Sequence, residues 1–522
     1  MDKISSIYLN IKLNLKKIFF FQKSLKNSKK YNKKNNFILF SIILILLQKQ
    51  LISPQYIVIK VNKEGRNQIL SDEYNGEYPS VSGNRLQTKF YDFPSKDYPI
   101  KFEWNDKFYN FSYMFNNLKN ITYIKINNML SGKINLSNML RNCINLETFS
   151  FESENKRDHN IGNMENMFYN CYSLKSFSFN KLNLDYHSFD RYENGDGTYR
   201  YKYHYYYISM SHMFYNCTNL ETIENSISYN IQYVINMSYM FFNCTSLQNN
   251  INLVNFTIDY NQDINLSYMF YNCQKLETIN FKKSYFHLSD MKYMFYNCSK
   301  LNHIYNLDHF SSSNNLNMSY LFFNCQSLES IVFQNNHFHI NDAREMFYNS
   351  SRLTTLTFYP YLTISPINIS RMFYNCNNLQ SIIINNGHSY FYPNDISSMF
   401  YNCTSLVTLS INKFNATKIE KLSYLFYNCT KMANLNLFPI YFPNEEIIDM
   451  KGIFQNCCSL VSLNLTLFYT PKVEIMWDMF NGCNKLKFLS IPNFDTSKVT
   501  DMQSMFSGCR SLTTLNLNHF NT

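Results

Sequence analysis

The stretch Met294-Phe295-Tyr296-Asn297-Cys298 decides the fold, because variants of it occur fifteen times between Met114 and Cys509. We call the Cys position of each copy the slot. Successive slots lie 25–29 residues apart, except for the step from Cys171 to Cys217, where 46 residues include an insertion. A fixed period of this length is typical of a stacked solenoid. It favours a long recognition surface over a catalytic centre. The slots are Leu118, Cys143, Cys171, Cys217, Cys244, Cys273, Cys298, Cys325, Ser350, Cys376, Cys403, Cys429, Cys457, Cys483 and Cys509.

The residues before each slot have the spacing of a short helix. Positions −7, −4 and −3 from the slot are apolar throughout, as in Met291, Met294 and Phe295. Together with the slot they occupy i, i+3, i+4 and i+7, which form one face of a helix. Position −1 is Asn in thirteen units and Gly in two. Both residue types tolerate a left-handed backbone, so we predict that the helical turn ends there.

The residues after each slot predict a strand. Positions +3, +6 and +8 are mostly apolar, as in Leu276, Ile279 and Phe281, which is the alternation of a strand with one side inward. We therefore predict an α/β repeat, a solenoid of about fifteen short helix–turn–strand coils stacked in parallel. A lone unit would leave much of its apolar surface exposed, so stability should belong to the array.

Three segments follow from this pattern. Residues 1–50 combine a basic region with an apolar run, residues 51–109 form an N-terminal cap or linker, and residues 110–522 form the solenoid. Ile57-Val58-Ile59 indicates a strand in the second segment, and Trp104 belongs to the cap. The solenoid has an insertion at about residues 181–208. The sequence ends in the middle of a unit.

The N-terminal segment carries most of the charge. Residues 1–36 hold ten lysines and one Asp, whereas the whole chain has a net charge of +11. The repeats are thus nearly neutral and do not indicate nucleic-acid binding. The apolar run 37–47 is too short to span a bilayer comfortably and suits the core of a signal peptide. An uncleaved signal-anchor and a buried strand of a cytosolic protein are the alternatives. Membrane contact is expected only through this run, if it is uncleaved.

The repeats resemble the BspA-like leucine-rich-repeat surface proteins of bacteria and protists. The resemblance rests on residues 499–512 (VTDMQSMFSGCRSL), on Leu515-Asn516-Leu517, and on the loop Phe494-Asp495-Thr496-Ser497, and it covers about residues 110–522. It implies a leucine-rich-repeat-like fold and a role in adhesion or recognition at the cell surface. It carries over no catalytic residues. This chain departs from the family in the Tyr or Phe that follows the Phe and in its longer loops, which leaves the ligand open.

All fourteen cysteines lie in the repeats, thirteen at the slot and one at Cys458. No Cys-x-x-Cys pair occurs, and one ligand per coil cannot surround zinc tetrahedrally. Neighbouring slots are close enough for disulfides, although their side chains would point the same way. We favour a ladder of buried small thiols, because Ser350 and Leu118 also occupy the slot.

Aromatic residues offer two candidate surfaces. A Tyr at position −2 recurs in eight units and predicts a stripe along the helical side, either adhesive or partly buried between coils. The second candidate is the cluster Tyr199–Tyr207 in the insertion, as an exposed loop. The stripe consists of Tyr169, Tyr215, Tyr271, Tyr296, Tyr348, Tyr374, Tyr401 and Tyr427.

The remaining polar residues give weaker signals. The outward strand positions are uncharged and suit glycan or protein surfaces, but they lack the titratable groups that catalysis needs; they are Ser178, Asn280, Ser410, Asn436, Ser490 and Asn516. His337 and His339 are a minor metal candidate. Glycosylation sequons include Asn135, Asn236, Asn265, Asn317 and Asn368, whereas Asn216 and Asn402 lie in expected helix caps.

The sequence thus predicts a secreted or cell-surface repeat protein for adhesion or recognition. We expect no catalytic, cofactor-binding or metal-binding residues and no cofactor. The expected partner is a protein or glycan. The alternative is an intracellular leucine-rich-repeat scaffold for protein–protein interaction.

Overall fold

The computed structural model describes residues 55–521, apart from several loops, all of them in the unit Gln55–Thr522. The predicted signal segment 1–50 lies outside the described residues. Among the residues that are described, no helix has the length and apolar character to cross a membrane. The loops left out are 105–109, 128–132, 153–159, 180–186, 194–198, 206, 225–233, 249–250, 253–262, 282–285, 308–309, 313–314, 334–337, 359–366, 385–391, 412–413, 416–418, 436–439, 442–445 and 467.

A mostly antiparallel sheet opens the described part of the chain, in the order β4-β3-β6-β1-β7-β9. Strand β1 pairs antiparallel with β7, and β7 pairs parallel with β9, so β1 occupies the edge of β7 that faces away from the later repeats. The predicted strand at Ile57–Ile59 and the buried Trp104 both belong to this sheet. The strands outside the repeats are β1 (Gln55–Val61), β2 (Gly65–Gln68), β3 (Ser80–Val81), β4 (Asn84–Arg85), β5 (Phe90–Phe93) and β6 (Ile100–Trp104).

The strand predicted after each slot is present in most repeats. These post-slot strands pair in parallel with their neighbours, and alternate residues are buried, as in the exposed–buried–exposed–buried pattern of β24. They are β7 (Ile121–Asn127), β9 (Thr148–Glu152), β11 (Ser176–Ser178), β15 (Thr222–Glu224), β17 (Ile251–Asn252), β19 (Thr278–Asn280), β21 (His303–Tyr305), β24 (Ser330–Phe333), β26 (Thr355–Phe358), β28 (Ser381–Ile384), β30 (Thr408–Ile411), β33 (Ser462–Asn464) and β34 (Phe488–Ser490).

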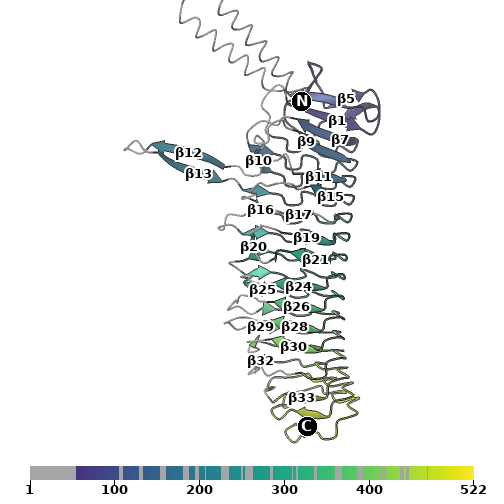
Figure 1. Cartoon of the computed structure of the whole chain (residues 1–522), viewed down its shortest axis with the longest axis vertical. Helices are drawn as coiled ribbons and strands as arrows, with labels where there is room; N and C mark the ends of the chain where they lie inside the picture. Colours follow the sequence, from purple (N-terminus) through teal and green to yellow (C-terminus); the bar gives the residue numbers. More distant parts are fainter. Residues whose placement is uncertain are drawn as a thin grey trace, which may run out of the picture. The chain divides into compact units, whose positions relative to one another are not determined.

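A second column of short parallel strands precedes the slots (Figure 1), and the sequence did not predict it. Most end at an Asn or Asp at position −8, whose Oδ1 accepts the N–H of position −6, as from Ser267 to Asn265 at 2.9 Å. This Asx turn ends the strand. These pre-slot strands are β8 (Lys133–Asn135), β10 (Asn160–Asn163), β14 (Ile208–Ser209), β16 (Val234–Asn236), β18 (Ile264–Asn265), β20 (Phe286–Asp290), β23 (Leu316–Asn317), β25 (Ile340–Asp342), β27 (Ile367–Asn368) and β29 (Pro393–Asp395).

The predicted helix is wrong: the described residues contain no α-helix, and positions −6 to −1 form consecutive turns. Two residues of each unit have a left-handed backbone. Position −1 does so as predicted, with φ of 58–62° at Asn and 71–77° at Gly. Position −5 does so as well, with φ of 52–58°, although it is often Tyr, as at Tyr293. A left-handed residue in mid-segment ends any helix there.

Hydrogen bonds explain why these turns form. The N–H of positions −4, −2 and 0 bonds within the coil, as from Cys298 to the carbonyl of Phe295 at 3.2 Å. The N–H of positions −7, −5, −3 and −1 instead donates to the following coil, as from Phe295 to the carbonyl of Leu321 at 2.9 Å. A helix would keep its hydrogen bonds within the segment. Alternate N–H groups of this segment therefore form hydrogen bonds between coils in place of the bonds that a helix would make within the segment.

The structure is thus a parallel-strand solenoid, as predicted. It does not support the predicted detail of fifteen regular helix–turn–strand coils. Its sheets are interrupted. The longest has nine strands, in the order β14-β16-β18-β20-β23-β25-β27-β29, with β22 (Phe310–Ser311) paired to β20. Near residue 414 the pairing continues in the pair β31 (Phe414–Asn415) and β32 (Ile440–Tyr441) and in single parallel bridges such as Asp395 with Lys421. The predicted insertion contains an antiparallel hairpin of β12 (His187–Glu193) and β13 (Tyr199–Tyr205).

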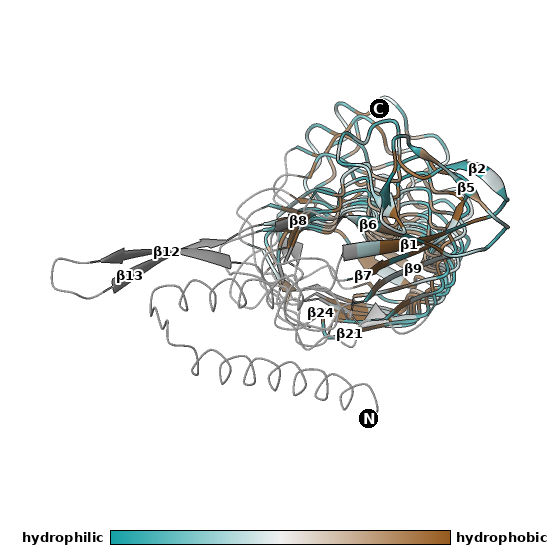
Figure 2. Cartoon of the chain, turned by 90° about the horizontal axis from the view of Figure 1, so that it is seen from above, coloured by the Kyte–Doolittle hydropathy of each residue, from teal (hydrophilic) through white to brown (hydrophobic). Residues whose placement is uncertain are grey.

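The core is a set of ladders that run from coil to coil. Met291, Met294, Phe295 and Cys298 are all buried, so the helix-like spacing identified the inward residues correctly even though the backbone is not helical. The position −3 Phe rings stack in parallel between successive coils, with centroids 5.5 Å apart for Phe270 and Phe295. Figure 2 shows these hydrophobic segments alternating with hydrophilic ones along the chain. Each coil therefore buries its apolar residues against the next.

Candidate functional site

The predicted tyrosine stripe is a continuous ring stack on the turn side of the solenoid. It joins the eight predicted tyrosines with Phe242 and Phe323, and neighbouring ring centroids lie 4.2–4.7 Å apart with interplanar angles of 1–9°. We call these ten rings, from Tyr169 to Tyr427, the outer row. All ten are partly exposed. The stripe is therefore both stacked between coils and accessible at its edge.

A second row of rings lies beside the outer row at position −5. It comprises His212, Tyr239, Tyr268, Tyr293 and Tyr320, stacked 4.5–4.7 Å apart. Rings of the two rows also touch within a coil, with centroids 5.6 Å apart for Tyr293 and Tyr296. Sequence reasoning missed this second row, although the recurrence of Tyr at position −5 was a readable signal.

Stacking determines what these rings can offer to a ligand. Each ring inside a row has both faces covered by its neighbours, so it presents its edge and its hydroxyl. Burial, followed by the neighbouring Tyr239, raises the pKa of Tyr268 to about 12, and burial raises the pKa of Tyr296 as well. The hydroxyls therefore remain protonated at neutral pH and act as hydrogen-bond donors and acceptors.

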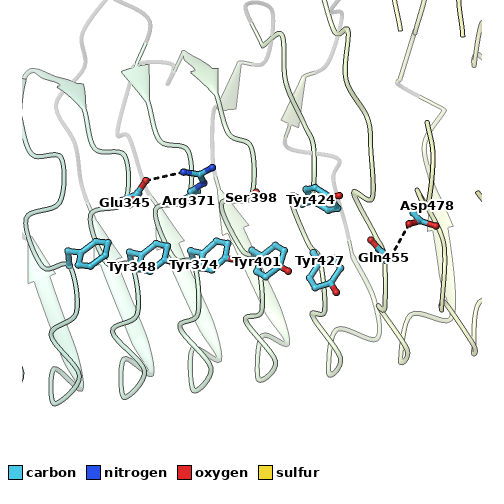
Figure 3. A pocket seen from close by; sticks show the side chains of 11 residues that line it. Glu345, Tyr348, Arg371, Tyr374, Ser398, Tyr401, Tyr424, Tyr427, Gln455 and Asp478 are labelled. Atoms are coloured by element: carbon cyan, nitrogen blue, oxygen red, sulfur yellow. Dashed lines mark hydrogen bonds and ion pairs between the residues drawn. The ribbon is translucent and has the colours of Figure 1, made fainter. Parts of the chain in front are cut away.

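A groove of about 680 Å³ opens along the outer row between Phe323 and Asp478. In this part of the second row the rings are replaced by Glu345, Arg371 and Ser398, and Figure 3 shows these residues beside the tyrosines of the outer row. The lining residues are Phe323, Glu345, Tyr348, Arg371, Tyr374, Ser398, Tyr401, Tyr424, Tyr427, Gln455 and Asp478. This groove is the candidate functional site.

The charged groups of the groove are paired with one another or with amides. Arg371 Nη1 lies 3.3 Å from Glu345 Oε1. Asp478 accepts hydrogen bonds from Gln455 Nε2 at 3.3 Å and from Asn481 Nδ2 at 2.8 Å. The groove thus has two carboxylates and one guanidinium, with no cluster of cations.

Tyr424 departs from the regular stacking and shapes one end of the groove. Its ring is nearly perpendicular to Tyr401 and Tyr427, at 80° and 86°. It lies against Gly452 of the next coil, where an added Cβ would come within 2.6 Å of the ring carbons. Gly452 also has a φ of 55°. Only glycine meets both conditions at this point.

The slot cysteines form the predicted ladder of buried thiols. They are free, and each donates a hydrogen bond to the position −3 carbonyl of the preceding coil, as from Cys298 Sγ to Phe270 O at 3.0 Å. Ser350 makes the same bond to Phe322 O at 2.9 Å, which explains why Ser fits the slot. Burial raises the pKa of Cys298 to about 12. The thiol therefore stays protonated at neutral pH, and the ladder is structural.

The other candidates of the sequence are not brought together into a site. His337 lies outside the described residues, and His339 contributes its backbone N–H to Ser312 Oγ. The described residues contain no group of three or more side chains suited to a metal ion. Of the cluster Tyr199–Tyr207, residues 199–205 form β13, and Tyr207 is exposed.

The sequon asparagines have a structural role. Asn135, Asn236, Asn265, Asn317 and Asn368 are the Asx-turn residues at position −8. Asn216 and Asn402, expected in helix caps, belong instead to a ladder of position −1 side chains, in which each Nδ2 donates to the Oδ1 of the preceding coil.

The outward strand positions are only in part a polar surface. Ser490 and Asn516 are exposed, whereas Ser178 and Asn280 are half-buried. Asn436 and the side chain of Ser410 lie outside the description. Apolar residues Val332 in β24 and Ile383 in β28 are exposed at the same position of their units.

The fold and the repeat define a leucine-rich-repeat solenoid. A family model described as "BspA type Leucine rich repeat region (6 copies)" matches residues 101–195, 318–442 and 344–467. A second, described as "Mycoplasma protein of unknown function, DUF285", matches residues 208–303 and 448–522. The chain is therefore a leucine-rich-repeat protein, and its repeats at residues 101–195 and 318–467 match the BspA type, as the sequence resemblance implied.

Solved structures similar to this chain include an internalin from Listeria monocytogenes, with 16% identity over 76% of this chain and 87% of that one and a TM-score of 0.23. The Toll–Spatzle complex of Drosophila has 16% identity over 76% and 48%, with a TM-score of 0.29. The TLR13–ssRNA13 complex has 15% identity over 72% and 50%, with a TM-score of 0.26. The chain thus spans about half the length of the last two. A comparison with curated proteins gave no match.

Proposed function

We propose that this chain is a secreted or cell-surface protein that recognises a protein or glycan through the turn side of its solenoid. The observation that carries the proposal is the outer row, a partly exposed stack of ten rings that borders a groove. Rigid aromatic side chains offer large contact areas at low entropic cost. Concave sites with a few polar groups are the usual form of a binding site.

A binding role suits the groove better than a catalytic one. Glu345 is paired with Arg371, and Asp478 accepts from two amides. A general base or nucleophile needs a free, activated group within reach of a substrate. BspA-type leucine-rich repeats are in general binding scaffolds, and we propose the same for this chain.

The domain organisation supports export. We propose that residues 1–50 direct the chain out of the cytoplasm, either as a cleaved signal peptide or as an anchor. We also propose that residues 55–104 cap the solenoid, because β1 covers the open edge of β7 with an antiparallel pairing. Caps of this kind prevent the edge of a repeat array from pairing with other chains.

Antibody labelling of intact cells that express the full chain tests this location. We expect labelling without permeabilisation. We also expect mass spectrometry of the mature chain to show either removal of residues up to about Gln50 or a membrane-retained N-terminus. Labelling only after permeabilisation, together with an intact Met1 in the cytosol, would establish the alternative, an intracellular scaffold.

A further inference from the structure

We propose that the groove binds a neutral oligosaccharide, with one sugar ring seated beside Ser398, where the second row lacks a ring. This inference rests on the proposed recognition function and deepens it by naming the ligand class. It follows from the space, the exposed ring surfaces and the charge balance of the groove.

The space arises because rings are missing from a regular stack. The second row has a ring in five consecutive coils up to Tyr320, at steps of 4.5–4.7 Å. The next three coils carry Glu345, Arg371 and Ser398 at the same position. Ser398 has a φ of 54°, similar to the 58° of Tyr320, so the backbone there is the one that elsewhere carries a ring. The missing side chain therefore leaves room for a ring from outside.

Two partly exposed rings, Tyr424 and Tyr427, line this end of the groove. Tyr427 is the last ring of the outer row, because Gln455 follows it, and the Gln455 amide is hydrogen bonded to Asp478. Tyr424 is turned across the stack toward Gly452, with Lys451 Nζ 5.3 Å from its centroid. The apolar face of a sugar ring packs on such an aromatic surface.

The polar lining favours a neutral ligand rich in hydroxyl groups. Tyrosine hydroxyls, Ser398 and the two carboxylates supply donors and acceptors along the groove. Carboxylates that accept from sugar hydroxyls form charge-assisted hydrogen bonds. The one cation in the lining, Arg371, is already paired with Glu345. Lys451, beside Tyr424, holds its Nζ over the Trp477 ring, 3.8 Å from the ring centroid.

The repeat distance argues against an extended peptide as the ligand. The tyrosine hydroxyls recur with the coils, at ring steps of 4.2–4.7 Å between Tyr348 and Tyr427. An extended peptide advances about 3.3 Å per residue and loses register with such a ladder after one step.

Isothermal titration calorimetry of the full chain with neutral hexasaccharides of glucose, mannose, galactose and N-acetylglucosamine tests the proposal. The decisive variant is Ser398→Tyr, which restores the missing ring. It should fold, because Tyr239, Tyr268, Tyr293 and Tyr320 occupy the same position. Its matched control is Ser504→Tyr, at position −5 of a coil outside the groove, with a φ of 55°.

We expect at least one hexasaccharide to bind the wild type and Ser504→Tyr equally, and Ser398→Tyr to weaken this binding by about tenfold or more. Equal binding by Ser398→Tyr would overturn the groove as the site. Absence of binding by all four hexasaccharides would overturn the ligand class. Labelling of intact cells would in that case still support the proposed location at the cell surface. Antibody labelling only after permeabilisation would instead overturn the proposed recognition role at the cell surface, whatever the calorimetry shows.

Discussion

Phe295→Ala is expected to lower the free energy of unfolding by about 3–5 kcal/mol, the range for deleting a buried Phe side chain. Phe295 is fully buried, and its ring stacks on Phe270 and Phe322 with centroids 5.5 and 5.4 Å away. The deletion leaves a cavity between two coils that depend on each other for burial. Because each coil contacts only its neighbours, the loss should separate the array at this point.

Urea unfolding followed by circular dichroism, with limited proteolysis to locate the opening, measures this effect. The matched control is Phe488→Ala, since Phe488 is 65% exposed on a post-slot strand. We expect the control to change stability by at most about 0.5 kcal/mol. Similar losses for the two variants would show that the Phe ladder is not the core of the stack.

The second large effect is expected from Asn297→Ala. Asn297 has a φ of 58°, its Nδ2 donates to Asn272 Oδ1 at 2.6 Å, and its Oδ1 accepts from Asn324 Nδ2 at 2.5 Å. Alanine would lose both bonds, at about 1 kcal/mol each. Alanine is also less stable than asparagine in the left-handed conformation, which costs an L-residue about 1–2 kcal/mol. We therefore expect a total loss of about 3–4 kcal/mol in the free energy of unfolding.

Asn297→Gly separates the two contributions in the same unfolding experiment. Glycine loses the side-chain bonds but accepts the backbone, as Gly482 and Gly508 do at this position. It should therefore lose about 2 kcal/mol. If the alanine variant were as stable as the glycine variant, the left-handed conformation at position −1 would be wrong.

The sequence predicted the inward residues, the post-slot strands and the position −1 turn, because each has its own chemical signature. Apolar spacing placed Met294, Phe295 and Cys298 in the core, and alternation placed the strand residues that follow. Asn and Gly marked the left-handed backbone. These features depend on one unit alone and can be read without its neighbours.

The backbone before the slot could not be predicted in the same way. Its apolar spacing of i, i+3, i+4 and i+7 is that of a helix, but the N–H groups bond to the next coil, which no single unit reveals. The left-handed φ of Tyr293 could not be predicted from its residue type either, since tyrosine rarely adopts this conformation. Gly452, Asn138 and Asn166 at the same position were the hints. Pre-slot strands as short as Ile264–Asn265 have no measurable period.

The groove could not be predicted from a single motif, because it is formed by residues at the same position of successive units. Glu345, Arg371 and Ser398 are unremarkable in their own units. They matter because position −5 carries rings in the coils before them. Comparing position −5 from unit to unit would have identified the gap, once that position was known to lie beside the outer row.

Both the turns between coils and the shape of the groove depend on the left-handed backbone at position −5. The most direct test of this conformation is the difference in free energy of unfolding between Ser398→Gly and Ser398→Ala. Ser398 has a φ of 54°, whereas its neighbour Ser397 is outside the left-handed region. Our account predicts that glycine is more stable than alanine at 398 by about 1–2 kcal/mol. At the control position 397, alanine should be the more stable residue. If alanine were the more stable residue at 398 by about 1 kcal/mol, as in a helix interior, the turn ladder would be contradicted.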